Sequence, residues 1–147
     1  MIVVGVDGSK CSHSALRFAL EEARIRHAKL RVVVVWHVPL AAYSAGLVPP
    51  PSNLADDAAA GAEEVLAEAL QGLERGDVEI ESLVREGQPA NVLVEESAAA
   101  EMLVVGSRGR GGFRELMLGS VSQQCAHHAR CPVAIVRAGC ECPPATE

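Results

Sequence analysis

Short apolar runs alternate with longer amphipathic stretches along this chain. Four runs have the length and the branched aliphatic content of buried strands: 2–6, 30–35, 102–105 and 132–136. A fifth stretch, 78–84, alternates apolar with polar residues, which predicts a strand at an edge of the sheet with one face near solvent. The chain therefore predicts five strands, four of them almost wholly apolar.

Helical spacing of apolar residues fills the intervals between these runs. It predicts helices over four segments: one that Ser9 or Ser12 caps, one over 54–73, one that begins at Pro89, and one over 120–129. Strands that alternate with helices are typical of a doubly wound, three-layer α/β domain with a parallel sheet. The pattern predicts this fold class but does not contain the order of the strands.

Two segments lack either periodicity. Residues 39–53 are rich in proline and small side chains, which predicts a mobile loop, because loops of this length inside a compact domain are usually lids or disordered connections. Residues 139–147 predict a polar, frayed C-terminal tail. We therefore expect one domain over 1–138 and a tail after it.

Composition narrows the class of protein. A chain of 147 residues with 49% hydrophobic content can form one domain with a substantial core. The net charge of −6 argues against a nucleic-acid or anionic-membrane partner, and 3% aromatic residues leave little for base stacking. The first apolar run is too short for a signal peptide, and no stretch approaches the roughly 20 apolar residues of a membrane span. These features predict a soluble, cytoplasmic protein.

The chain shows little sign of metal or hydrolytic chemistry. Its five cysteines are odd in number, which favours free thiols over a disulfide framework. The pair Cys140 and Cys142 lacks the two-residue gap usual for zinc ligands, so we expect no metal site. No serine–histidine–aspartate set or paired-carboxylate motif is present in the sequence, which argues against a dedicated hydrolase and leaves no catalytic residue to assign.

The most distinctive stretch is 103–121, LVVGSRGRGGFRELMLGSV. A buried strand runs into glycines at 106, 109 and 119, and a helix is predicted to begin at Ser120. These glycines can adopt positive φ and turn their N–H groups into one concavity, beside the partial positive charge of a helix N-terminus. The stretch predicts a phosphate site made of main-chain amides. The spacing is not that of the P-loop, since no Gly-Lys-Ser/Thr follows.

The spacing G-x2-G-x9-G-S resembles the signature of the ATP-binding subgroup of the universal stress protein family. The likeness extends to the opening IVVGVDGS, the segment WHVP after the second strand, and the closing HHARCPVAIVR. It implies an adenine nucleotide alpha hydrolase-like fold with strand order 3-2-1-4-5. In such a sheet a ligand binds beyond the carboxyl ends of strands one and four. The resemblance also implies a homodimer through the final strand, Val133 to Val136, whose open edge needs a partner.

The same resemblance implies which residues bind the nucleotide. They are Gly5, Val6, Asp7, Val38, Gly106, Ser107, Arg108, Gly109, Gly119, Ser120, Val121 and Ser122. Asp7 is expected to accept hydrogen bonds from ribose or from the adenine amino group, or else to cap the first helix. The main chain of Val38 is implied to pair with the adenine edge. Arg108 and its neighbour Arg110 either screen phosphate charge or solvate the loop.

The sequence thus predicts a regulatory protein of the stress response that binds or sequesters ATP, with Mg²⁺ as the ion that accompanies the phosphates. Asp7 is the acidic residue placed to hold that ion. Two alternatives remain open: a dimeric interaction module that binds no nucleotide, and a slow ATPase with weak hydrolysis or autophosphorylation.

Overall fold

The computed structural model describes residues 1–38, 51–110 and 118–139. The loop predicted over 39–53 lies outside the described residues except for its last three positions. The tail predicted over 139–147 lies outside them except for Gly139.

Five strands alternate with four helices in the described chain, as the pattern predicts. In order they are β1 (Ile2–Gly5), α1 (Lys10–Arg26), β2 (Leu30–Trp36), α2 (Leu54–Leu70), β3 (Ile80–Glu86), α3 (Pro89–Glu96), β4 (Met102–Gly106), α4 (Ser120–His128) and β5 (Val133–Val136). The second helix ends three residues before the predicted Leu73, because Gln71 turns to an extended conformation (ψ 126°) and Gly72 follows at φ +71°. Leu73 still packs against the core.

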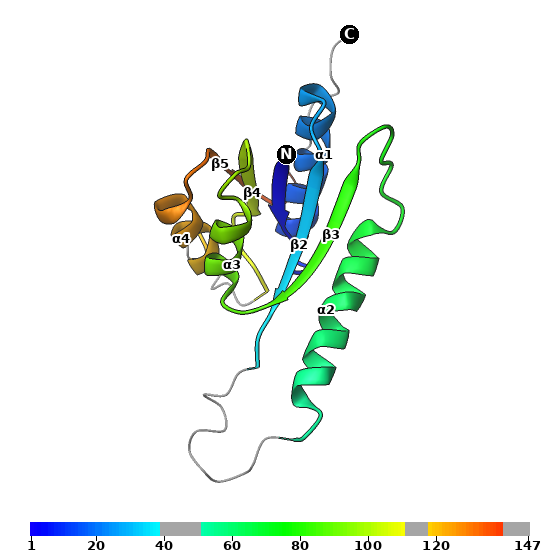
Figure 1. Ribbon diagram of the computed structural model, residues 1–147, viewed down its shortest axis with the longest axis vertical. Coiled ribbons are helices and arrows are strands. Elements are labelled where there is room, and N and C mark those ends of the chain that lie inside the picture. The colour runs from blue at the N-terminus through cyan, green and yellow to red at the C-terminus, as the bar shows by residue number, and fades with distance from the viewer. Residues whose placement is uncertain (39–50, 111–117, 140–147) are drawn as a thin grey trace.

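The strands form one parallel sheet in the order β3-β2-β1-β4-β5. Val4 of β1 pairs with Val32 on one side and with Val104 on the other. The chain leaves β1 for the helix on one face of the sheet and leaves β4 for the helix on the opposite face (Figure 1). The carboxyl ends of β1 and β4 therefore lie side by side at the point where the order reverses, where parallel sheets of this kind leave a crevice.

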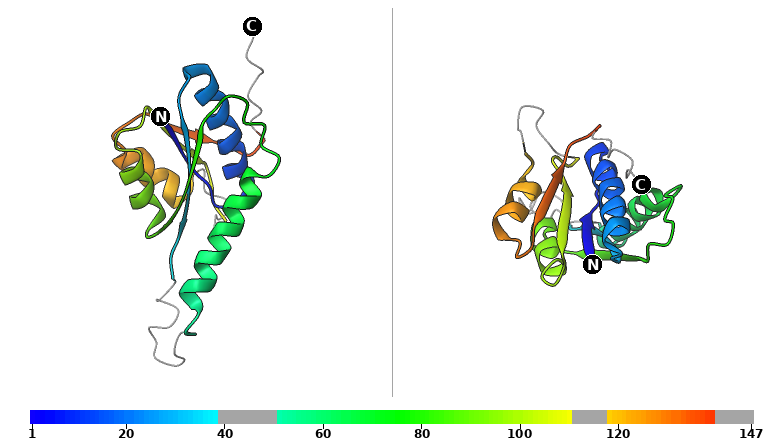
Figure 2. Two further views of the ribbon diagram at one scale, coloured as in Figure 1. Left: turned by 45° about the vertical axis from the view of Figure 1, so that its right-hand side comes forward. Right: turned by 90° about the horizontal axis from the view of Figure 1, so that it is seen from above.

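Helices cover both faces of the sheet, α1 and α2 on one side and α3 and α4 on the other (Figure 2). Val4 faces the core under α1 and α2, whereas its neighbour Val3 faces the core under α3. Both side chains are fully buried. Coverage of both faces explains why β1, β4 and the part of β2 after Arg31 read as continuous apolar runs rather than as alternating ones.

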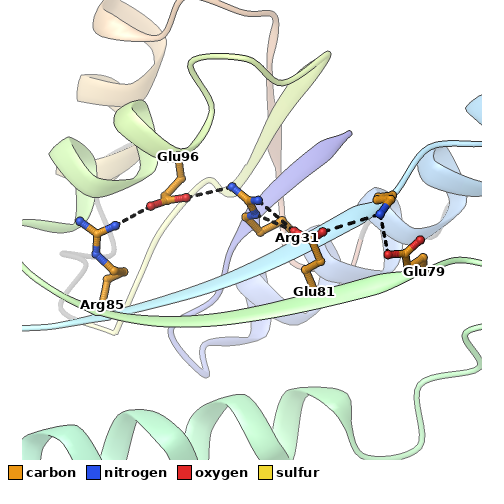
Figure 3. A network of polar contacts seen from close by, with 6 residues as sticks. Arg31, Glu79, Glu81, Arg85 and Glu96 are labelled. Atoms are coloured by element: carbon orange, nitrogen blue, oxygen red, sulfur yellow. Dashed lines mark hydrogen bonds and ion pairs between the residues drawn. The ribbon is translucent and has the colours of Figure 1, made fainter.

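The third strand lies at the edge of the sheet, as its alternating pattern predicts. Arg31 of β2 stands directly opposite Glu81 of β3 and pairs with it at 2.9 Å, and it also pairs with Glu96 of α3 at 3.0 Å (Figure 3). Arg85 binds the same Glu96 carboxylate at 2.7 Å. This network joins the edge of the sheet to α3 through charged groups that remain partly in solvent.

No helix in the described part of the chain is long and apolar enough to cross a membrane.

Candidate functional site

A cleft of about 580 Å³ opens at the carboxyl ends of β1 and β4. This size is ordinary for a small-molecule pocket. Most of the positions predicted for ligand binding line it: Gly5, Val6, Asp7, Gly106, Arg108, Gly109, Gly119, Ser120, Val121 and Ser122. The fold thus brings residues from the first corner, near position 7, and from the glycine segment, near positions 106–122, to one cavity.

Two predicted positions do not line the cleft. Ser107 is buried, and its hydroxyl donates to the Cys11 sulfur at 3.7 Å. Its carbonyl accepts the Gly119 N–H at 2.7 Å, so Ser107 joins the two ends of the glycine segment. Val38 follows β2 and is half-buried outside the cleft, whereas its neighbour His37 lines it. The middle of the glycine segment, 111–117, lies outside the described residues.

The glycines of the segment do not have the backbone conformation predicted for them. None of the three glycines at 106, 109 and 119 has a positive φ; that of Gly119 is −77°. Glycine is needed at positions 106 and 109 because a side chain there would not fit. A Cβ on Gly106 would lie 2.9 Å from the Cys11 main chain, and one on Gly109 would lie 2.6 Å from the Asp7 carboxylate. These glycines let the segment pack against the first corner, which a side chain would prevent.

The N-terminus of α4 faces the cleft without a side-chain cap. Gly119 has the extended conformation of an N-cap residue (φ −77°, ψ 165°) but offers no side chain to accept the first N–H groups of the helix. By contrast, Ser9 caps α1 by accepting the Ser12 N–H at 3.2 Å. Ser120, Val121 and Ser122 line the cleft at the positive end of the α4 dipole. This end of the cleft suits an anion.

The Ser122 hydroxyl is directed back into the protein. It lies 2.9 Å from the Gly119 carbonyl and 3.1 Å from the Ser107 carbonyl, and it donates to this pair. Ser122 is buried, so its role is to fix the turn that leads into α4. The exposed Ser120 is the first residue of that helix and leaves its hydroxyl at the cleft.

Asp7 does not cap the first helix, because Ser9 does. One oxygen of the Asp7 carboxylate accepts the Ser9 N–H at 3.0 Å, and the other accepts the Arg110 N–H at 3.1 Å. Asp7 lines the cleft together with Arg108 and Arg110. The described lining therefore includes two arginines and one aspartate, whose charges sum to a net positive charge.

The cleft also has an apolar wall, which sequence reasoning missed. It is formed by Val33, Val35, Pro89, Leu93, Val105 and Leu118. Leu93 of α3 reaches the cleft because Gly5 leaves room: a Cβ there would lie 2.7 Å from the Leu93 Cδ1 atom. Nothing in the sequence distinguishes these side chains from ordinary core residues, since Val33 and Leu93 also belong to the core under α3.

A helix N-terminus without a side-chain cap beside an apolar wall, at the reversal point of a doubly wound parallel sheet, is the arrangement of α/β nucleotide-binding folds. The model of the Universal stress protein family matches residues 1–137. The chain belongs to the universal stress protein family, and its fold is the adenine nucleotide alpha hydrolase-like fold of that family.

Relatives and solved structures agree with this assignment. A universal stress protein of Mycolicibacterium smegmatis is 37% identical over 138 residues, which cover 92% of this chain and 45% of that protein. This chain thus spans about half the length of the curated relatives it matches. A universal stress protein in complex with cAMP has a TM-score of 0.69 at 27% identity and covers 94% of this chain and 97% of its own. A universal stress protein of Archaeoglobus fulgidus in complex with dAMP has a TM-score of 0.66 at 25% identity and covers 92% and 95%.

Proposed function

We propose that this protein binds an adenine nucleotide, ATP, in the cleft between β1 and β4, and that occupancy regulates it or sequesters the nucleotide. The observation that carries the proposal is the uncapped N-terminus of α4, which faces a cavity of about 580 Å³. Related proteins of the same fold hold cAMP and dAMP, which supports the adenine base.

The phosphates and the base of the nucleotide bind at different parts of the cleft. The phosphates lie against the glycine segment and the first turn of α4, where main-chain N–H groups and two arginines are available. The base lies against the apolar wall around Val33, Val35 and Leu93. Val38 follows β2 and does not line the cleft, but its neighbour His37 does, so a base that extends past His37 reaches the Val38 main chain and pairs with it.

The described lining does not fit a protein-bound magnesium ion. Asp7 is its one carboxylate, and both of its oxygens already accept main-chain N–H groups. We therefore assign Mg²⁺ no ligand from these residues.

A cytoplasmic location, where ATP is plentiful, suits the binding of this nucleotide.

We further propose that two copies pair through β5. This strand lies at an edge of the sheet, and three of its four residues, Val133, Ala134 and Ile135, are only half-buried. A second copy would satisfy the outward main-chain groups and cover these side chains.

The direct test begins with the nucleotide that copurifies. The purified protein is denatured, and the released small molecules are identified by mass spectrometry; ATP or another adenine nucleotide is the expected result. Protein stripped of ligand is then titrated with ATP and with GTP. Tighter binding of ATP supports the proposal, and absence of binding to either nucleotide at millimolar concentration contradicts it in favour of a nucleotide-independent interaction module. Release of phosphate from bound ATP, followed over hours, identifies a slow ATPase.

A further inference from the structure

The Asp7 carboxylate joins two segments that are 103 residues apart in sequence. Oδ1 accepts the Ser9 N–H of the first corner at 3.0 Å, and Oδ2 accepts the Arg110 N–H of the glycine segment at 3.1 Å. Hydrogen bonds that end on a charged oxygen are stronger than those between neutral groups. Asp7 therefore holds the first half of the glycine segment against the start of α1.

Two glycines allow this contact to close. A Cβ on Gly109 would lie 2.6 Å from Asp7 Oδ2, and among the described residues, its two chain neighbours aside, Asp7 alone would come within 4 Å of it. A Cβ on Gly8, which has φ +78°, would lie 2.6 Å from the Nη2 atom of Arg110. The guanidinium of Arg110 thus rests on Gly8 while its main chain is held by Asp7. We call these four residues, Asp7, Gly8, Gly109 and Arg110, the Asp7 clasp.

We propose that Asp7 is a positioning residue: it fixes the glycine segment and sets the Arg110 guanidinium at the phosphate end of the cleft, and it does not read the base or the sugar. The proposal rests on the proposed function and deepens it. Both carboxylate oxygens are engaged by main-chain N–H groups, whereas Arg110 lines the cleft, and its guanidinium, which lies over Gly8, carries the charge that phosphates require. Arg110 then distinguishes ligands by their number of phosphates.

The two roles of Asp7 predict different responses to edited ligands. Asp7→Ala is titrated with ATP, 2′-deoxyATP, 3′-deoxyATP and inosine triphosphate. A positioning residue lowers the affinity for all four by one common factor, about tenfold for the loss of a charged hydrogen bond. A direct contact with ribose or the adenine amino group lowers affinity only for ligands that carry the contacted group, so the ratio between ATP and one edited ligand falls toward one. That second result overturns the proposal.

Gly109→Ala provides an independent test, because its Cβ displaces the same carboxylate oxygen. Gly109→Ala alone should weaken ATP binding about as much as Asp7→Ala. The double variant should bind no more weakly than Asp7→Ala alone, since the obstructed oxygen is gone. Losses that multiply in the double variant contradict the clasp. Gly61→Ala is the matched control, because a Cβ at that helical position would meet no atom within 4 Å in the described part of the chain beyond its own stretch of helix.

Arg110 is tested by Arg110→Gln, which keeps a polar side chain and removes the charge. It should lower affinity for ATP more than for ADP, and for ADP more than for AMP; equal losses for the three would refute its role.

Hydrogen exchange separates this proposal from the proposed function. In protein free of nucleotide, the Arg110 amide should exchange more slowly in the wild type than in Asp7→Ala. Equal exchange rates contradict the clasp whether or not the protein binds ATP, whereas absence of ATP binding with slow wild-type exchange contradicts the proposed function alone.

Discussion

The N-terminus of α4 has no side-chain cap, so a negatively charged residue introduced there should bind the free N–H groups of the first turn in place of a phosphate. Gly119 already has N-cap backbone angles, so Gly119→Asp places a carboxylate where it can accept N–H groups of the first helical turn. A cap in place of glycine contributes a few tenths of a kcal/mol, and a negative charge at the dipole contributes about 0.3–1 kcal/mol. The new Cβ would lie 3.4 Å from the Arg108 Cα atom, an ordinary van der Waals distance, so the backbone can accommodate the side chain.

The same carboxylate should exclude a phosphate. It occupies donors that the ligand uses and repels its charge, which together cost about 1.5–3 kcal/mol, or roughly 10- to 100-fold in affinity. Gly119→Asp should therefore melt at or slightly above the wild-type temperature while it loses ATP binding. Stability and binding move in opposite directions, which is not the behaviour of a variant that misfolds.

Thermal melting without ligand and calorimetric titration with ATP measure the two effects. Gly119→Ala is the matched control, because it adds the same Cβ without an acceptor or a charge, and it should lose less affinity than Gly119→Asp. Unchanged ATP binding in Gly119→Asp would refute the reasoning. Equal losses in the aspartate and alanine variants would show that bulk, and not the helix terminus, decides binding at this position.

Three further predictions follow from other parts of the structure. Gly106→Ala should destabilise the protein by about 1–3 kcal/mol, since its Cβ would lie 2.9 Å from the Cys11 main chain. Gly61→Ala, whose Cβ enters open space on α2, should stabilise it by about 0.5–1 kcal/mol. Chemical denaturation measures both changes, and the same sign for the two variants would contradict this prediction. Burial raises the pKa of the Cys125 thiol to about 11 from its ordinary 9.0, so the folded state keeps a proton that the unfolded state loses, and stability should fall as the pH rises through this window. Relative to Cys125→Ala, the wild type should lose about 2 kcal/mol by the upper end of that window, and parallel pH curves for the two proteins would be the contrary result. Light scattering should give twice the 15.4 kDa mass of the chain if β5 pairs two copies, and a mass of one chain at every concentration rules that pairing out.

Much of the fold follows from the pattern of apolar residues. A strand such as β1 is covered on both faces, so its sequence is continuously apolar and its place inside a parallel sheet can be predicted. Strand order cannot be predicted this way, because helices cover both faces of every buried strand, whichever strands lie next to it in the sheet. The order came from the resemblance of the glycine spacing and the chain ends to a known family, and the structure confirms it.

The site was predicted less completely than the fold. The glycine spacing singled out a segment that lines the cleft, but the reason predicted for the glycines was wrong: Gly106 and Gly109 avoid contact with Cys11 and Asp7 and do not adopt positive φ. Contacts between segments so far apart in sequence have no local signature. The apolar wall was missed for a related reason, because a valine that lines a cleft and a valine in the core look the same in a sequence.

The central claim is that the cleft between β1 and β4 binds an adenine nucleotide, and a calorimetric titration of the ligand-free protein with ATP tests it most directly. The account predicts saturable heat that corresponds to one ATP per chain and that is greatly reduced in Gly119→Asp. Absence of heat up to millimolar ATP, or heat that is the same in the wild type and in Gly119→Asp, would contradict it.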